Sequence, residues 1–166
     1  MARLTSISPE TATGEAKTLL DAVAKKMGKA PNMTRAMAVQ PAVLEGYLGF
    51  SGALAKGRLD AKTRAAIALA VAGVSGCDYC ASAHSYVSGS LKVDQAEIDN
   101  RLAGRSDDPR IAAILTFAKA VVETRGQVSD AELAAVRSAG FDDADIGEVI
   151  ANVALNSFTN LFNNVA

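Results

Sequence analysis

The chain contains few residues that carry out redox, metal or acid–base chemistry near neutral pH: two cysteines and one histidine among 166 residues. It has no tryptophan, and aromatic residues make up only 5% of the sequence, so large rings do not fill its core. Neither sign of charge dominates, because 17 basic and 18 acidic residues give a net charge of -1. A nucleic-acid-binding protein usually has a basic face, so we expect no nucleic-acid partner.

Long hydrophobic runs are also lacking, and we expect no secretory leader. The longest apolar run, residues 65–74, has ten residues, about half the length that a bilayer-spanning helix needs. Residues 1–10 do not contain the apolar core of a signal peptide. We therefore expect a soluble, cytoplasmic protein with no membrane partner. In a reducing compartment, two cysteines that lie close together are more often catalytic or metal-binding than structural.

What the sequence does contain is a succession of helical patterns. Apolar residues recur at spacings of three and four, and glycine or proline separates the segments. Asp60, Asp94, Asp108 and Ser129 stand where helices begin, and the second and fourth have glutamate at the capping-box position. No segment alternates with the period of two that a strand requires. We predict an all-α fold, a compact bundle of eight or nine helices that forms one domain over residues 1–166.

Both cysteines and the histidine lie in one segment of eight residues, 77–84. Offsets of zero, three and seven return to one face of a helix, so Cys77, Cys80 and His84 are expected along one exposed edge. Ser75 and Gly76 interrupt the preceding helix, which places the cysteines in the first turn of the next helix. Their Cα atoms would be about 5 Å apart, which suits a disulfide. The helix N-terminus favours a thiolate, and His84 lies close enough to exchange its proton.

Three other interpretations of this segment stay open. Cys77 and Cys80 can be two small buried hydrophobic residues, and His84 can be a core histidine bonded to a backbone carbonyl. Together the three side chains offer zinc ligands, but a structural zinc site wants four, and one rigid helical face fits a tetrahedron poorly. We therefore expect no metal and no cofactor. Tyr79 is expected to pack against its neighbours or to line the mouth of a pocket.

Several segments, and not the cysteine pair alone, carry a family resemblance. They are residues 59–64, 66–72, 76–84, 139–143, 148–150 and 156–163. Together these segments resemble the alkylhydroperoxidase D-like branch of the carboxymuconolactone decarboxylase superfamily. The resemblance implies an all-helical protein that assembles as a homo-oligomer, a trimer or a hexamer. It also implies thiol peroxidase activity.

Carried over by the resemblance, each residue of the segment has a role. Cys80 attacks the hydroperoxide substrate, Cys77 resolves the resulting sulfenic acid as a disulfide, and His84 carries the proton. An external dithiol or protein reductant then restores both thiols. No organic cofactor is needed for this cycle.

Two positions depart from the family pattern. Family members with good activity usually carry a glutamate twelve residues before the first cysteine, where this chain has Ala65. Some also place a histidine between the cysteines, where this chain has Tyr79. Both belong to the family's proton relay, so we expect a slow peroxidase or a changed role. Glu148 can replace the lost carboxylate if the last helix folds back over the site.

Two alternative functions follow from the same features. One is a carboxymuconolactone decarboxylase-type enzyme, although that branch does not need the cysteine pair. The other is a non-catalytic redox-sensing module whose disulfide changes conformation, and the alanine at position 65 favours it.

The last predicted helix carries a ladder of asparagines at positions 152, 156, 160 and 163 or 164. Asparagine is a mediocre helix former, so a merely solvated face would more often show lysine, glutamate or glutamine. We expect the ladder to form hydrogen bonds at a subunit interface or beside the redox site. An exposed polar face is the alternative.

Overall fold

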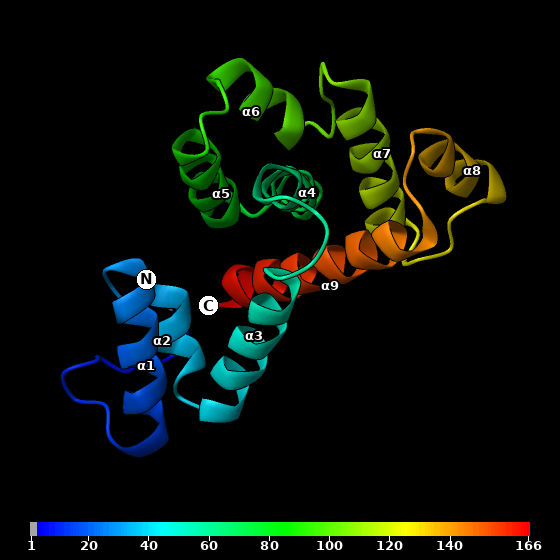
Figure 1. Ribbon diagram of the computed structural model, residues 1–166. Helices are drawn as coiled ribbons and strands as arrows, with labels where there is room; N and C mark the ends of the chain where they lie inside the picture. The colour runs from blue at the N-terminus through cyan, green and yellow to red at the C-terminus, as the bar shows by residue number, and fades with distance from the viewer. Residues whose placement is uncertain (1–2) are drawn as a thin grey trace. The chain divides into compact units, whose positions relative to one another are not determined.

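The computed structural model describes residues 3–166, and these residues fold into helices (Figure 1). In chain order the helices are α1 (Gly14–Met27), α2 (Asn32–Met37), α3 (Pro41–Leu54), α4 (Ala61–Ser75), α5 (Asp78–Ser90), α6 (Gln95–Leu102), α7 (Pro109–Glu123), α8 (Asp130–Ser138) and α9 (Asp143–Val165). No strand occurs in this part of the chain. The prediction of an all-α fold with eight or nine helices is confirmed. Residues 1 and 2 lie outside the described range. They belong to the segment 1–10, for which we expect no signal peptide.

The predicted N-caps explain where most of these helices begin. The Asp60 side chain accepts a hydrogen bond from the backbone N–H of Thr63 at the start of α4. Ser129 and Glu132 form the predicted reciprocal capping box at the start of α8. Each cap satisfies backbone donors that a helix end otherwise leaves without an acceptor.

Only half of the predicted capping box forms at the start of α6. The Asp94 carboxylate accepts the N–H of Glu97 at 2.8 Å. The Glu97 carboxylate accepts instead from Nε of Arg101, at 2.7 Å, and from the Ser106 hydroxyl. A charge-assisted bond to a nearly buried guanidinium is stronger than a bond to an exposed backbone N–H, which explains why the box stays open.

The chain divides into two compact units. The first contains the residues up to Ala53 together with Phe162–Ala166, and the second contains Leu54–Leu161. Within the first unit, fully buried Leu20, Met37 and Leu44 join α1, α2 and α3 in one apolar cluster. A single domain over residues 1–166 stays a prediction.

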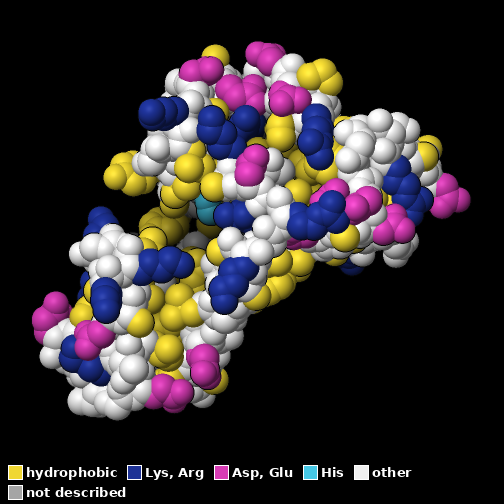
Figure 2. Space-filling view, viewed as in Figure 1, with side chains coloured by type: hydrophobic (Ala, Val, Ile, Leu, Met, Phe, Trp, Pro, Cys, Tyr) yellow, Lys and Arg dark blue, Asp and Glu magenta, His cyan; other side chains and the backbone are white. Residues whose placement is uncertain are grey.

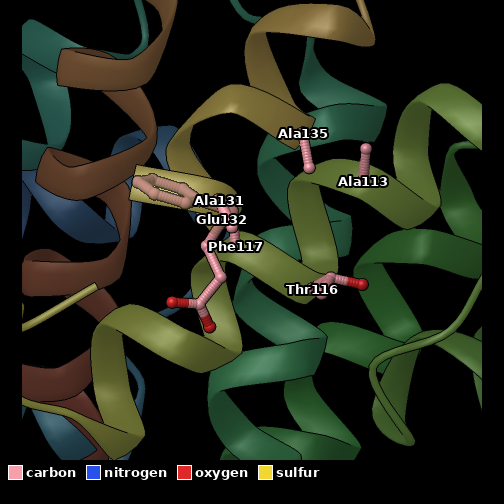
Figure 3. A pocket seen from close by; sticks show the side chains of 6 residues that line it. All are labelled: Ala113, Thr116, Phe117, Ala131, Glu132 and Ala135. Atoms are coloured by element: carbon pink, nitrogen blue, oxygen red, sulfur yellow. The ribbon is translucent and has the colours of Figure 1, made fainter. Parts of the chain in front are cut away.

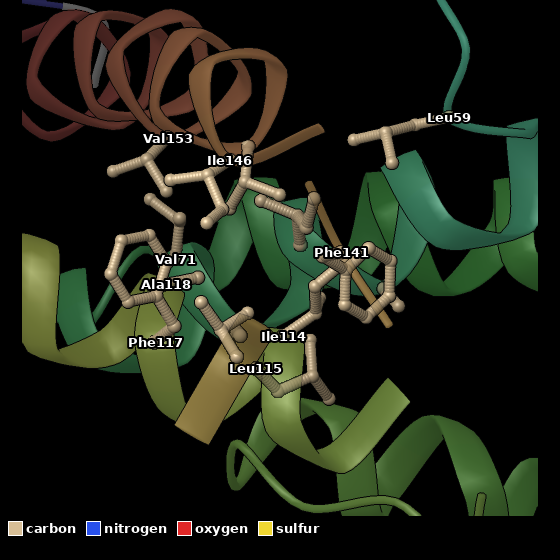
Figure 4. Packing of buried hydrophobic residues seen from close by; sticks show 14 residues of the cluster. Leu59, Val71, Ile114, Leu115, Phe117, Ala118, Phe141, Ile146 and Val153 are labelled. Carbon is tan, nitrogen blue, oxygen red and sulfur yellow. The ribbon is translucent and has the colours of Figure 1, made fainter. Parts of the chain in front are cut away.

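Helix α4 forms the centre of the second unit. Every residue from Ala65 to Ala72 is buried, as expected for a helix that is apolar on all sides. Its large side chains join α7, α8 and α9 in one core, which contains Ile67, Val71, Ile114, Leu115, Val136 and Val149 (Figure 4). On another side α6 comes so close that a Cβ at Gly73 would collide with the carbonyl oxygen of Leu102.

Basic and acidic side chains are interspersed over the face that Figure 2 shows. Within residues 3–166, no helix combines the length and the apolar composition that a membrane crossing requires.

Candidate functional site

The site residues lie where α4 ends and α5 begins. Gly76 takes a left-handed conformation with φ of 58°, which closes α4 after Ser75. A left-handed backbone conformation costs glycine less free energy than it costs other residues. Gly76 therefore indicates in the sequence that α4 ends here. Cys77 follows in an extended conformation as the N-cap of α5. The predicted interruption and the start of a new helix at the cysteines are confirmed.

The two cysteines are joined in a disulfide, with Cα atoms 5.3 Å apart. That separation lies within the range that a disulfide spans without backbone movement. The Cys77 sulfur also accepts the backbone N–H of Cys80 at 3.3 Å. Cys77 therefore does with sulfur what serine or aspartate does at other N-caps.

The expectation that both sulfurs lie along an exposed edge is wrong for the single chain. Cys77 is 2% exposed and Cys80 is 3% exposed. They pack with Ala72 of α4 and with Ala81 in a small apolar cluster. The helical offset places side chains on one face, but it does not show whether that face meets solvent or another helix. Here the face meets α4.

His84 lies one turn after Cys80 on α5 and is half-buried. Burial lowers the pKa of His84 from 6.5 to about 4. Removing the imidazole from water penalises its charged form, and no carboxylate among residues 3–166 offsets that cost. At neutral pH the ring is therefore uncharged and has a free nitrogen lone pair for accepting a proton.

Glu148 does not act as the missing carboxylate. Its oxygens accept the backbone N–H of Arg58, at 2.7 Å, and that of Leu59, at 3.2 Å. Gly57 permits this approach, since a Cβ there would collide with the Glu148 carboxylate. The glutamate thus fixes the loop before α4. At the position where the family carries its glutamate, Ala65 is buried in α4 and 6% exposed.

The asparagine ladder on α9 is not an exposed polar face. Asn152, Asn156 and Asn160 are 3%, 7% and 0% exposed. Each side-chain amide donates to the backbone carbonyl four residues earlier. The Asn160 side-chain oxygen is buried without a hydrogen-bond partner. The solvated alternative is excluded, while a role at an interface or beside the redox site stays a prediction.

Tyr79 is 46% exposed on the outer side of α5, so it does not pack into the core of the chain. No group of three histidine, cysteine, aspartate or glutamate side chains that would hold a metal ion occurs within residues 3–166. The three zinc ligands that the sequence offers, Cys77, Cys80 and His84, therefore do not form such a group in the described part of the chain.

One cavity of about 350 Å³ lies between α7 and α8 (Figure 3). Alanines and Phe117 supply most of its wall, and its one charged group, Glu132, is already bonded to Ser129. None of the three candidate residues lines it. This cavity has no convergent polar groups and is not a candidate active site.

Sequence reasoning missed one residue that shapes the site, Ala72, and one role of a predicted residue, Cys77. Ala72 covers the sulfurs, and the Cys77 sulfur caps α5. The capping role has a local sign in the sequence, because Cys77 directly follows the helix-ending Gly76. The sequence has no sign of the covering role. It does not show which of the many alanines in α4 packs against the sulfurs until the packing is known.

A family model for the carboxymuconolactone decarboxylase family matches residues 41–123, which include α4, α5 and the disulfide. The chain belongs to the carboxymuconolactone decarboxylase family. No curated protein matches the sequence significantly.

Solved structures from this fold are similar over nearly the whole chain. The alkylhydroperoxidase AhpD core of a peroxidase-related protein from Ralstonia eutropha JMP134 has a TM-score of 0.87 and 24% identity, covering 98% of this chain and 88% of its own. A peroxidase-related protein from Silicibacter sp. TM1040 has a TM-score of 0.79 and 25% identity, covering 100% and 91%. The debrominase Bmp8 has a TM-score of 0.82 and 18% identity, covering 99% and 89%. The fold is thus alkylhydroperoxidase D-like, and the solved proteins that share it include a debrominase.

Proposed function

We propose that the protein is a thiol-dependent peroxidase that reduces hydroperoxides through Cys80 and Cys77, assisted by His84. The observation that carries the proposal is the cysteine pair at the N-terminus of α5, already at disulfide distance and one turn from a neutral imidazole. Similarity to two peroxidase-related proteins supports the same assignment.

The proposed cycle has three balanced steps. The Cys80 thiolate attacks the terminal oxygen of ROOH, the O–O bond breaks, and the products are Cys80 sulfenic acid and, after protonation, ROH. The Cys77 thiol then attacks the sulfur of the Cys80 sulfenic acid. The hydroxyl group leaves as water, and a disulfide forms between the two sulfurs. An external dithiol reduces that disulfide and is itself oxidised to a disulfide. Two electrons pass from the dithiol to the peroxide in each turnover, with no organic cofactor.

The N-cap hydrogen bond supports a specific course for the reduction step. The N–H of Cys80 points at the Cys77 sulfur, and the helix N-terminus adds positive potential there. Both stabilise a thiolate on Cys77. The reductant therefore attacks the Cys80 sulfur, and Cys77 leaves as the capped thiolate. A mixed disulfide forms on Cys80 before the second thiol of the reductant resolves it.

His84 serves as the proton acceptor for the Cys80 thiol. Its lowered pKa keeps it unprotonated at neutral pH, but the same shift makes it a weak base. Without a glutamate at position 65, nothing from that position stabilises the imidazolium that forms. We expect a slow enzyme, and the nearly complete burial of both sulfurs limits it further, because the peroxide reaches them only when the site opens locally.

The remaining properties of the proposed enzyme follow from the composition of the sequence and from the family resemblance. It acts in the cytoplasm, takes its electrons from a small dithiol or a protein reductant, and assembles as a trimer or a hexamer. It needs neither nucleic acid nor a membrane as a partner.

Single cysteine variants test this proposal with cumene hydroperoxide and excess dithiothreitol. Cys80→Ser should lower turnover at least about 10³-fold, to the rate of the dithiol alone, because the attacking sulfur is lost. With dithiothreitol left out, Cys77→Ser should consume one equivalent of peroxide and leave a sulfenic acid on Cys80 that dimedone traps, visible by mass spectrometry. Ser82→Ala, at an exposed position of the same helix, is the matched control. Full turnover by Cys80→Ser would contradict the proposal.

A redox-sensing module is the second candidate, favoured by the buried sulfurs and by Ala65. A sensor is oxidised once and does not turn over when dithiol is in excess. Counting peroxide consumed per chain separates the two, since a peroxidase consumes many equivalents and a sensor one.

A further inference from the structure

Cys77 belongs both to the end of α4 and to the start of α5. Its backbone N–H donates to the carbonyl of Ala72 at 3.2 Å, and the N–H of Gly76 donates to the carbonyl of Gly73 at 3.4 Å. These two bonds form a Schellman motif, which ends a helix with a left-handed residue. On its other side, the Cys77 sulfur accepts the N–H of Cys80 and caps α5. Both helix ends therefore hold the sulfur that closes the disulfide in the proposed cycle.

The left-handed residue of this motif is Gly76, with φ of 58° and ψ of 35°. This conformation is unfavourable for a residue that has a Cβ. A Cβ at Gly76 would meet no atom within 4 Å outside its chain neighbours. A larger residue here would therefore strain the backbone that places Cys77 without colliding with another part of the chain.

We propose that Gly76 is a positioning residue for disulfide closure, because its left-handed conformation places the Cys77 sulfur beside Cys80 before the sulfenic acid forms. The inference rests on the proposed function for its chemistry, whereas the placement is a property of the two thiols alone. In the disulfide, the covalent bond holds Cys77, so a larger residue at 76 has to keep the strained conformation. In the dithiol, only the N-cap bond and a small apolar cluster hold the first turn of α5, which can relax. Strain at position 76 therefore acts against the disulfide.

Placement of the Cys77 sulfur decides between two fates of the sulfenic acid on Cys80. Cys77 attacks the Cys80 sulfur, the S–O bond breaks, and the hydroxyl leaves as water while the disulfide forms. A second hydroperoxide instead transfers an oxygen atom to the same sulfur, which gives a sulfinic acid and ROH. A dithiol reverses the first reaction but not the second. A thiol already placed beside Cys80 favours the first, because a reaction within one chain does not wait for a collision.

The first test needs no peroxide. Each variant is equilibrated with mixtures of reduced and oxidised glutathione, and mass spectrometry after alkylation gives the effective concentration of the two thiols. Gly76→Ala should lower this effective concentration about 10-fold, as expected from the cost of a left-handed alanine. Gly76→Asn should stay near the wild-type value, because asparagine tolerates the left-handed conformation. Gly76→Ser imposes the same strain as Gly76→Ala and should match it.

Gly140→Ala is the matched control for strain elsewhere. Gly140 follows α8 in the same compact unit, has φ of 88°, and likewise has room for a Cβ. Its replacement by alanine imposes a comparable strain at the end of another helix. The effective concentration of the two thiols should stay unchanged in this variant, and circular dichroism checks that every variant folds.

The second test uses the proposed reaction. The reduced wild type and Gly76→Ala are mixed with excess cumene hydroperoxide in the absence of a dithiol. Cys80 should be oxidised to the sulfenic acid at the wild-type rate, because Gly76 acts after that step. The fraction of Cys80 found as sulfinic acid by mass spectrometry should rise up to about 10-fold in Gly76→Ala.

Three results would overturn the inference. One is a folded Gly76→Ala variant with the effective concentration of the wild type. Another is an equal fall in Gly140→Ala, which would show a general loss of stability. The third is an equal fall in Gly76→Asn, which would show that the left-handed conformation is not the cause. A wild-type chain that does not react with cumene hydroperoxide would contradict the proposed function instead, and the glutathione equilibrium would still decide the role of Gly76.

Discussion

Helices α4 and α5 follow one another in the chain and differ in what they bury. Every residue of α4 from Ala65 to Ala72 is buried, and this stretch contains no side chain with redox or acid–base chemistry. Helix α5 buries only Cys80 and Ser88 and is capped by the buried Cys77. Its other side exposes Tyr79 and Tyr86.

This difference indicates that α4 and α5 have separate roles in the second unit. Helix α4 supplies the packing that holds the unit together, and α5 lays its reactive side chains against that packed surface. Truncations in α4 should therefore act on stability alone, whereas adding or removing an ionisable or reactive side chain where α4 meets α5 should also act on chemistry. Substitutions that act on the wrong property would break this division, and those that act on one property alone would sharpen it.

The largest expected effect on stability comes from Leu69→Ala in α4. Leu69 is fully buried, so its truncation removes packed methyl groups and leaves a cavity. We expect the free energy of unfolding to fall by about 2–5 kcal/mol, measured by urea denaturation. Peroxide turnover per folded molecule should stay unchanged.

The matched control for this change is Val87→Ala in α5. Val87 is 44% exposed, so its truncation should cost less than about 1 kcal/mol. Equal losses for the two variants would show that α4 does not have the structural role assigned to it.

Ala65→Glu connects the two helices and should have the next largest effect. A carboxylate here occupies the position of the family's glutamate, and we expect it to stabilise the protonated form of His84. We expect peroxide turnover to rise about 10- to 100-fold, at the low end of what general-base assistance contributes. Initial rates with cumene hydroperoxide and dithiothreitol measure the gain.

Ala68→Glu is the control for the new carboxylate. Ala68 is 3% exposed in the same helix, so both variants bury a carboxylate and should be similarly destabilised. Only the substitution at position 65 should accelerate turnover. Equal rates for both variants would show that turnover does not depend on the position of the new carboxylate.

Most of the local structure follows from the sequence. The helix ends at Asp60, Gly76 and Ser129 depend on contacts between residues at most four positions apart. They can therefore be predicted from the local sequence. The disulfide distance between Cys77 and Cys80 also follows from helix geometry once the helix start is fixed. The family segments add the expected roles of these residues.

Contacts between distant residues could not be predicted in this way. Glu148 bonds to Arg58, 90 residues earlier, and no local pattern at either end identifies the other. The burial of the asparagines on α9 also depends on which side of the helix meets the rest of the chain. Their spacing of four fits an exposed and a buried face equally well. The same ambiguity explains why the sulfurs were expected at an exposed edge.

The smallest effect concerns His84, whose packing links the stability of the chain to pH. The chain has one histidine, so it is the source of any histidine titration. Its pKa is about 4 in the folded protein and near 6.5 in the unfolded chain. Between these values the unfolded chain binds a proton that the folded chain does not, so stability falls as pH falls. The ring is partly exposed, so we expect a loss of about 1–3 kcal/mol between pH 7 and pH 4.

Urea denaturation at both pH values, for the wild type and for His84→Gln, isolates this contribution. Carboxylates with lowered pKa values, such as Asp60 and Asp142, also titrate in acid, but they do so equally in both proteins. The difference between the two proteins therefore reports on the imidazole alone. It should be present at pH 7 and should disappear as pH falls to about 4. Parallel curves would mean that water reaches His84, so the inner side of α5 would be open to solvent. The reactive side of α5 would then not be packed against α4. The different roles assigned to the two helices would be contradicted at His84, the residue that tests them most directly.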